Sequence, residues 1–137
     1  MVVIDAQIKM YVDDNDFKEC RDIALEVMGL SYVAESKKNI TAWRAVDTGR
    51  LRRSINYKTR KTQIAKENPE DSLTVQPKEG EVCIGTNVSY AGFVEYGSGA
   101  MPPRPFLRYT YDSHTPLAQQ RFQKEFVKQL VTRSKHG

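Results

Sequence analysis

Residues 45–55, with the sequence AVDTGRLRRSI, join a helical pattern to a strand pattern. Within them lies a turn signature, Asp47-Thr48-Gly49, because Asp and Thr side chains bond nearby backbone amides and Gly tolerates a positive φ. From residue 53 to residue 59 the side chains alternate in character, which predicts a strand. The turn therefore separates a helical part of the chain from a sheet region, which we place at residues 50–96.

Before this turn, the sequence predicts one strand and one long helix. Apolar and polar residues alternate across residues 1–12, so we expect a half-buried N-terminal strand. Across residues 16–42 the apolar positions recur every three or four residues, which predicts a long amphipathic helix. Gly29 lies inside this helix and costs about 1 kcal/mol relative to alanine, so we expect a bend or a close contact there.

After the turn, short strand patterns alternate with loops. The polar, proline-containing sequence at residues 64–80 predicts a loop, with a short strand at residues 73–75 inside it. A further strand is expected at residues 81–85. Residues 88–96 are compatible with a strand or with one or two helical turns.

The last third of the chain predicts a loop and a helix. Residues 97–108 are rich in proline and glycine, which makes regular structure implausible. From residue 115 to residue 133 an apolar face beside several lysines predicts a C-terminal helix. We therefore expect one α+β domain over residues 1–137: an antiparallel sheet of about four strands packed by a long N-terminal helix and a C-terminal helix.

The charges are distributed in blocks along the chain, although the net charge is only +4. Residues 1–36 and residues 67–103 each carry a net charge of −5, residues 37–66 carry +9, and residues 104–137 carry +5. Blocks of opposite sign can neutralise one another within a fold, or they can meet between neighbouring copies of a subunit. The sequence is compatible with both arrangements.

Composition excludes several classes of protein. Hydrophobic residues make up 39% of the 137 residues, which suggests a thin core or one completed by partner subunits. No apolar run approaches the roughly 20 residues of a membrane-spanning helix. The first residues lack the basic leader and apolar stretch of a signal peptide. We therefore expect no membrane association.

Few residues are suited to catalysis or metal binding. Cys20 and Cys83 lie among apolar neighbours and are expected to be buried, and no CxxC or HExxH motif suggests a zinc site. His114 follows Asp112 and Ser113, but adjacent residues project in different directions and cannot form a triad. A polar loop before the last helix explains them better. We expect no enzyme activity and no cofactor.

Within the basic block at residues 37–66, the cluster at residues 50–61 is the strongest candidate for a ligand site. On a strand, Arg50, Arg52, Lys58 and Arg60 would share one face, which could contact phosphates. The same face could also be solvated or could meet an acidic block of another subunit. We favour the interface, and a small basic nucleic-acid-binding protein is the alternative function.

Three stretches in order resemble one protein family: AVDTGRLRRSI at 45–55, VCIGTNVSYAGFVEYG at 82–97, and RPFLR at 104–108. Over about residues 16–132 the chain resembles the tail-component family of long-tailed bacteriophages, typified by gene product ten of the Hong Kong 97 phage. After residue 108 the chain has Tyr109-Thr110 where that family usually has Pro-Ala, so the resemblance does not fix the residue at which the last helix begins. Pro116 is a candidate for the cap of that helix.

The resemblance implies a virion structural protein, made in the host bacterial cytoplasm. It would be a neck or tail-completion subunit of the head–tail connector. Such subunits typically form hexameric or dodecameric rings that join the capsid portal to the tail. The implied partners are further copies of the chain and other phage connector and tail proteins, with channel DNA close by. No cofactor, reaction or membrane is implied.

The matched motifs also suggest which residues serve assembly and which serve the fold. Glu95 is expected to meet a cation, with Arg50, Arg52 or Arg104 as candidates, and Tyr90 and Phe93 are expected to pack under the long helix. The proline-rich loop is stiff and suits an interface. The candidate interface residues are Arg50, Arg52, Arg53, Tyr90, Glu95, Tyr96, Pro102, Pro103, Arg104, Pro105 and Phe106. The candidate structural residues are Thr48, Gly49, Leu51, Ser54, Gly85, Ala91 and Gly97.

Overall fold

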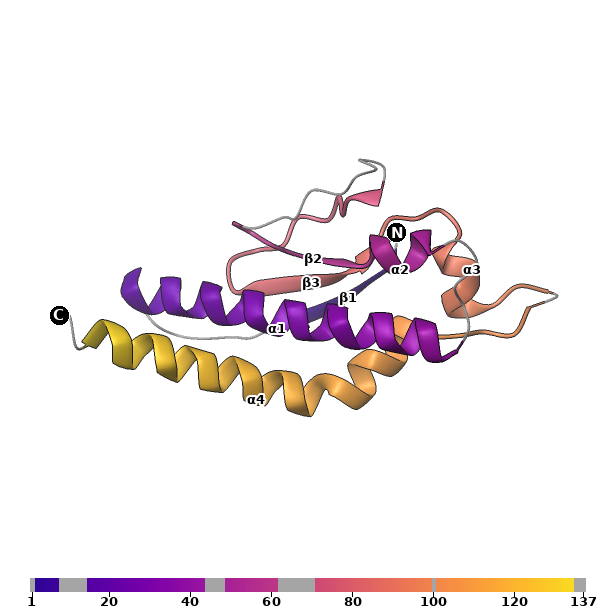
Figure 1. Ribbon diagram of the computed structural model, residues 1–137. Coiled ribbons are helices and arrows are strands. Elements are labelled where there is room, and N and C mark those ends of the chain that lie inside the picture. The colour runs from indigo at the N-terminus through magenta and orange to yellow at the C-terminus, as the bar shows by residue number, and fades with distance from the viewer. Residues whose placement is uncertain (1, 8–14, 44–48, 62–70, 100, 135–137) are drawn as a thin grey trace.

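The computed structural model describes residues 2–7, 15–43, 49–61, 71–99 and 101–134 (Figure 1). Within them the chain forms three strands and four helices. In chain order these are β1 (Val2–Gln7), α1 (Asn15–Ala42), α2 (Arg50–Ser54), β2 (Asn56–Thr59), β3 (Glu81–Thr86), α3 (Ala91–Tyr96) and α4 (Phe106–Ser134). The predicted α+β class and both long helices are confirmed, and the predicted helix at 16–42 differs from α1 by one residue.

The sheet of the described residues has three antiparallel strands in the order β1-β3-β2, not the expected four or so. Strand β3 is central, and Ile84 lies opposite Ile4 of β1 and Tyr57 of β2. The strand expected at 73–75 is wrong. Leu73 is 1% exposed, so this segment contributes one side chain to the core without joining the sheet.

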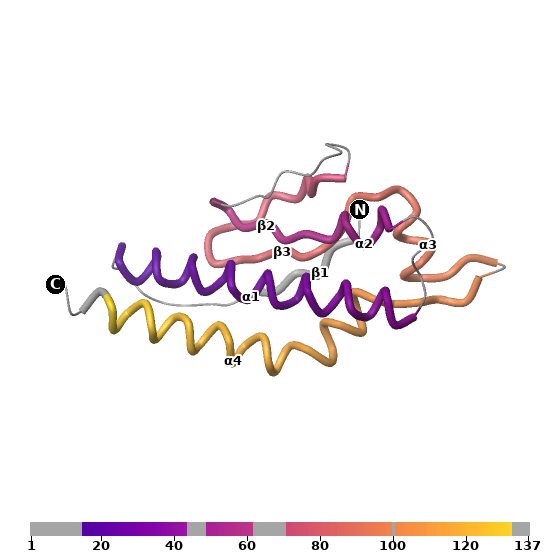
Figure 2. The backbone as a smooth tube through the Cα atoms, viewed as in Figure 1, coloured from indigo at the N-terminus to yellow at the C-terminus, as the bar shows by residue number. Residues whose placement is uncertain are grey.

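The two long helices pack on the sheet and on each other (Figures 1 and 2). Helix α1 packs on β2 and β3, and α4 runs antiparallel to α1 along its length and also contacts β1. The core therefore joins sheet residues such as Tyr57 and Ile84 to Met28 of α1 and to Phe106 and Phe122 of α4. Because α1 is covered on two sides, its apolar residues occupy more than one stripe.

The segment 50–54 is a helical turn rather than the start of a strand. Gly49 adopts a left-handed conformation with φ of 76°, and Leu51 and Ser54, three residues apart, both point into the core. The strand begins only at Asn56. The sequence pattern had predicted that Arg50 and Arg52 share a strand face with Lys58, which is wrong because both arginines lie on α2.

Helix α4 begins at Phe106, nine residues before the expected start at residue 115. The predicted loop at 97–108 therefore ends at residue 105. Pro116 is not a cap but lies inside the helix, where its ring removes one backbone hydrogen bond. The tube in Figure 2 changes direction after the first turns of α4, as expected for a proline inside a helix.

We predict that Gly29→Ala destabilises the protein even though alanine is the better helix former. A Cβ at Gly29 would lie 2.9 Å from Cγ of Tyr57, so either α1 or β2 must shift. Such overpacking costs about 1–3 kcal/mol in the free energy of unfolding, more than the gain in helix propensity. Urea denaturation measures the difference.

The matched control is Gly92→Ala in α3, because a Cβ there meets no atom within 4 Å. We expect this variant to be neutral or stabilised by up to about 1 kcal/mol. Equal effects of the two substitutions would contradict the close contact between α1 and β2.

Candidate assembly interface

Large exposed side chains gather on α3 and on the hairpin that follows it, which projects from one end of the molecule (Figure 1). We call this the α3–hairpin surface. The exposed fractions are 37% for Tyr90, 59% for Phe93, 66% for Tyr96 and 39% for Met101. Exposed Pro102 and Pro103 complete the surface. Exposed apolar side chains grouped in this way are typical of interaction sites.

This exposure corrects one expectation. Tyr90 and Phe93 were predicted to pack beneath the long helix, but only their neighbours Ala91 and Val94 contact the core. In the six-residue helix α3, positions 91 and 94 or 95 face inward, which turns Phe93 and Tyr96 outward. The interface role predicted for Tyr90 and Tyr96 is compatible with this placement.

The hairpin is held by its own backbone. The amides of Ser98 and Met101 each donate to the other's carbonyl at 3.0 Å, and the Arg104 amide donates to the Val94 carbonyl at 2.7 Å. Gly97 has φ of 80°, and a Cβ there would lie 2.9 Å from the backbone nitrogen of Pro103. Gly97 is therefore required where the chain leaves α3.

Glu95 binds a helix N-terminus, not the cation that the sequence suggested. Its side chain is 2% exposed, and its two carboxylate oxygens accept the backbone amides of Leu107 and Arg108, each at 3.0 Å. These amides have no partner within the helix, and the positive end of the helix dipole favours a carboxylate. Glu95 therefore joins α3 to the first turn of α4.

The predicted basic residues do not form a single patch. Arg50 donates to both carboxylate oxygens of Asp71, at 2.8 and 3.2 Å. Arg52 donates to the Thr41 hydroxyl at 3.2 Å, and Arg53 is exposed on α2. Arg104 lies at the base of the hairpin. Glu95 accepts backbone amides of α4 instead of pairing with one of these arginines.

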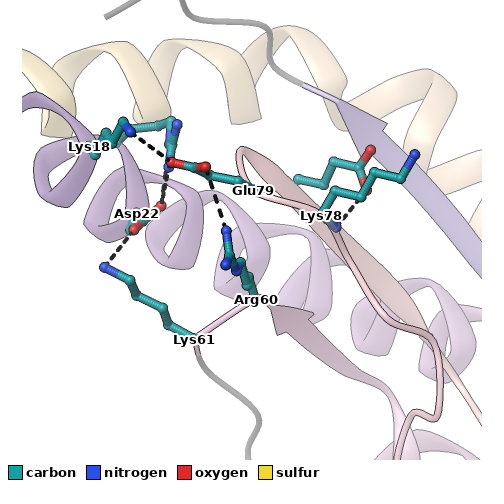
Figure 3. A network of polar contacts seen from close by, with 8 residues as sticks. Lys18, Asp22, Arg60, Lys61, Lys78 and Glu79 are labelled. Carbon is teal, nitrogen blue, oxygen red and sulfur yellow. Dashed lines mark hydrogen bonds and ion pairs between the residues drawn. The ribbon is translucent and has the colours of Figure 1, made fainter. Parts of the chain in front are cut away.

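Glu79 is the centre of an ion-pair network that links distant parts of the sequence (Figure 3). Its carboxylate lies 3.1 Å from Arg21, 3.6 Å from Lys18 and 3.5 Å from Arg60. The hydrogen bond from Arg21 and the charge of Lys18 hold the pKa of Glu79 below its ordinary value. The network joins α1 to the turn before β3 and to the end of β2.

Asp22 extends this network to a further member of the basic block. Its carboxylate pairs with Arg21 at 3.1 Å and with Lys61 at 3.1 Å. Together with the pair between Arg50 and Asp71, these contacts bring the basic block at 37–66 against both acidic blocks. For these residues, opposite charges are neutralised within the fold.

Most of the predicted structural residues lie in or beside the core. Leu51 is 3% exposed and Ala91 is fully buried, and Gly85 is buried in β3. The Ser54 hydroxyl donates to the Leu51 carbonyl and lies 2.6 Å from the Thr86 hydroxyl. Thr48 lies outside the described residues.

One residue expected at the interface belongs to the core. Phe106 is fully buried, so it anchors the hairpin but cannot contact a neighbour. Pro105 is partly exposed and directly precedes α4, and its interface role stays a prediction. Pro102 and Pro103, nearer the tip of the hairpin, are exposed as expected.

A polar layer between α1 and α4 was not predicted. Nε2 of His114 lies 2.5 Å from the Ser31 hydroxyl, which also accepts a hydrogen bond from Arg121 at 3.2 Å. The Tyr32 hydroxyl lies 2.7 Å from that of Thr115. His114 was expected in a loop, so the sequence held no signal for its burial between two helices.

Comparison with known families decides what kind of protein carries these features. Residues 4–97, more than half of the chain, match the family described as "Bacteriophage HK97-gp10, putative tail-component". The chain belongs to this HK97-gp10-like family. No curated protein and no solved structure matched the chain in the same comparisons.

Members of the HK97-gp10-like family are structural components of the phage tail, so the chain is a virion structural protein. The matched region runs from β1 to Gly97 and therefore includes α3 and the Glu95 side chain. It ends before α4.

The described part of this family member offers no group of three His, Cys, Asp or Glu side chains that could hold a metal ion. None of its described helices is long and apolar enough to span a membrane.

We predict that Glu95→Gln lowers the free energy of unfolding by about 1–3 kcal/mol, because the buried amides of α4 lose a charged acceptor. Urea denaturation of the variant and of the wild type measures the loss. Asp112→Asn is the control, since this exposed side chain also lies on α4. A loss no larger than that of the control would contradict the capping role.

We also predict that the protein becomes less stable as the pH falls below about 7. Burial lowers the pKa of His114 from its ordinary 6.5; among nearby charges Glu35 raises it, whereas Arg121 and Lys38 lower it. Between the folded pKa and 6.5 the unfolded state binds more protons, so the free energy of unfolding decreases as the pH is lowered through this window.

The measurement is urea denaturation at pH 7.5 and at pH 5.5, for the wild type and for His114→Gln. We expect a smaller pH dependence in the variant, because glutamine does not titrate. The same change with pH in both proteins would show that His114 does not cause it.

Proposed function

We propose that the chain is a ring-forming subunit of the phage head–tail connector, at the neck or at the top of the tail. Its membership of a tail-component family and the α3–hairpin surface support this role. The projecting position of that surface is the observation that carries the proposal (Figure 1). The contact it makes is with a second copy of the chain.

A second apolar surface lies at the opposite end of the molecule. Val127 and Val131, one helical turn apart near the end of α4, are 56% and 46% exposed. Figure 1 places this end of α4 away from α3 and the hairpin. A contact between two unlike surfaces at opposite ends repeats from copy to copy, and it gives a ring where the rotation closes.

The stiffness of the hairpin favours such a contact. Its backbone hydrogen bonds, the prolines and the Glu95 cap fix its position before association. A preorganised loop loses less conformational entropy on binding, so more of the apolar burial contributes to affinity. The aromatic residues Phe93 and Tyr96 are of the kind that supplies most of the binding energy at interfaces.

The remaining features of the proposal follow from the family. The ring would be a hexamer or a dodecamer between the capsid portal and the tail. Its other partners would be connector and tail proteins of the same phage, met after synthesis in the host cytoplasm. The ion pairs of Arg50, Arg60 and Lys61 favour this role over that of a general basic nucleic-acid-binding protein, because they occupy part of the basic block.

The test is the native mass of the protein, measured by light scattering over a wide range of protein concentration. We expect a discrete multimer for the wild type. Phe93→Glu, at an exposed position of α3, should dissociate it while leaving the fold intact, and Val131→Glu should do the same from the other surface.

Leu30→Glu is the matched control, because Leu30 is 51% exposed on α1 and belongs to neither surface. It should assemble as the wild type does. A wild type that is monomeric at every concentration, or a control that dissociates equally, would reject the proposed contact.

A further inference from the structure

A shallow open groove of about 460 Å³ lies beside the C-terminal part of α1 and the helical turn α2. Three of its six lining residues carry a positive charge, and the other three have small side chains. The lining residues are Ala34, Lys37, Lys38, Thr41, Ala42 and Arg52. The surface that lines the groove is mostly apolar, and three of the residues that border it carry a cation.

The guanidinium of Arg52 is positioned by the helix beside it. The Thr41 hydroxyl donates to the Lys37 carbonyl at 2.9 Å and accepts from Arg52 at 3.2 Å. This holds Arg52 against the same turn of α1 that carries Lys37. Lys38 is 77% exposed, and its nearest acid, Glu35, is 3.9 Å away, at the limit of an ion pair. All three cations therefore remain available to an anion at the groove.

We propose that this groove binds the backbone phosphates of duplex DNA. Lysine and arginine are the usual phosphate ligands, and a guanidinium can bind two phosphate oxygens at once. Contacts to phosphates carry no sequence information, so binding should be independent of base sequence.

An acidic surface of a second copy is the less favourable occupant. Asp22, Asp71 and Glu79 are engaged in ion pairs within the chain, and Glu95 is buried against α4. These four carboxylates of a neighbouring copy are therefore already engaged, whereas DNA presents a dense row of phosphates. The inference rests on the groove and is independent of ring formation.

The experiment measures binding of a fluorescent 20-base-pair duplex by anisotropy, at about 50 and about 200 mM salt. Three phosphate contacts give a slope of about −2.7 in log affinity against log salt, which is roughly a 40-fold loss over this range. The triple variant Lys37→Gln, Lys38→Gln and Arg52→Gln should lose most of the affinity and of the slope.

The control is a second triple variant with the same change in net charge: Lys18→Gln, Arg60→Gln and Lys61→Gln, which alters the Glu79 network instead. We expect it to retain the affinity and the slope of the wild type. Thermal unfolding of both variants shows that they are folded, and the native mass, measured in parallel, reports separately on assembly.

Three outcomes would overturn the proposal. The first is that the wild type does not bind the duplex at about 50 mM salt. The second is an equal loss in the two triple variants, which would mean that net charge alone drives binding. The third is displacement of the DNA by polyglutamate at equal charge concentration, which would assign the groove to an acidic protein partner.

Discussion

Helix α1 is covered both by the sheet and by α4, and this constraint determines how the rest of the chain is arranged. One side packs so closely on β2 that the backbone of Gly29 faces the ring of Tyr57. The other side carries α4 along its length. A helix in this position has no single apolar stripe, which is why two overlapping series of apolar residues can be found in its sequence.

The two sides of α1 differ in chemistry. The side facing the sheet is mainly apolar, with ion pairs of Arg21 and Asp22 near the start of the helix. The side facing α4 also includes the contacts of Ser31 with His114, of Tyr32 with Thr115 and of Asn39 with Thr110. Within the described residues, the Ser36 hydroxyl is a buried side-chain group without a hydrogen-bond partner. A layer of this kind specifies how two helices align but contributes less free energy than an apolar one.

The Glu95 carboxylate connects this helical layer to the proposed interface. By accepting two amides of α4 it fixes the start of that helix and the direction in which α3 and the hairpin project. The exposed aromatic residues of α3 are therefore attached to a rigid support, as a subunit contact requires. Further charges stabilise the fold itself, since the acidic blocks bind much of the basic block through Glu79, Asp22 and Asp71.

The sequence by itself determined the local structure and the family. The helix at 16–42, the strand at 81–85 and the glycine turn at position 49 depend on neighbouring residues, so they could be predicted without coordinates. The motifs at 45–55 and 82–97 indicated the tail-component family for the same reason.

Only the tertiary structure decided where the side chains of these elements meet. Glu95 binds amides twelve and thirteen residues away, His114 lies against Ser31 on another helix, and Phe93 faces outward rather than inward. The early start of α4 depends on the Glu95 cap, which the sequence around residue 106 does not reveal. Contacts between residues far apart in the chain depend on how the layers pack, and no local pattern of residues encodes that packing.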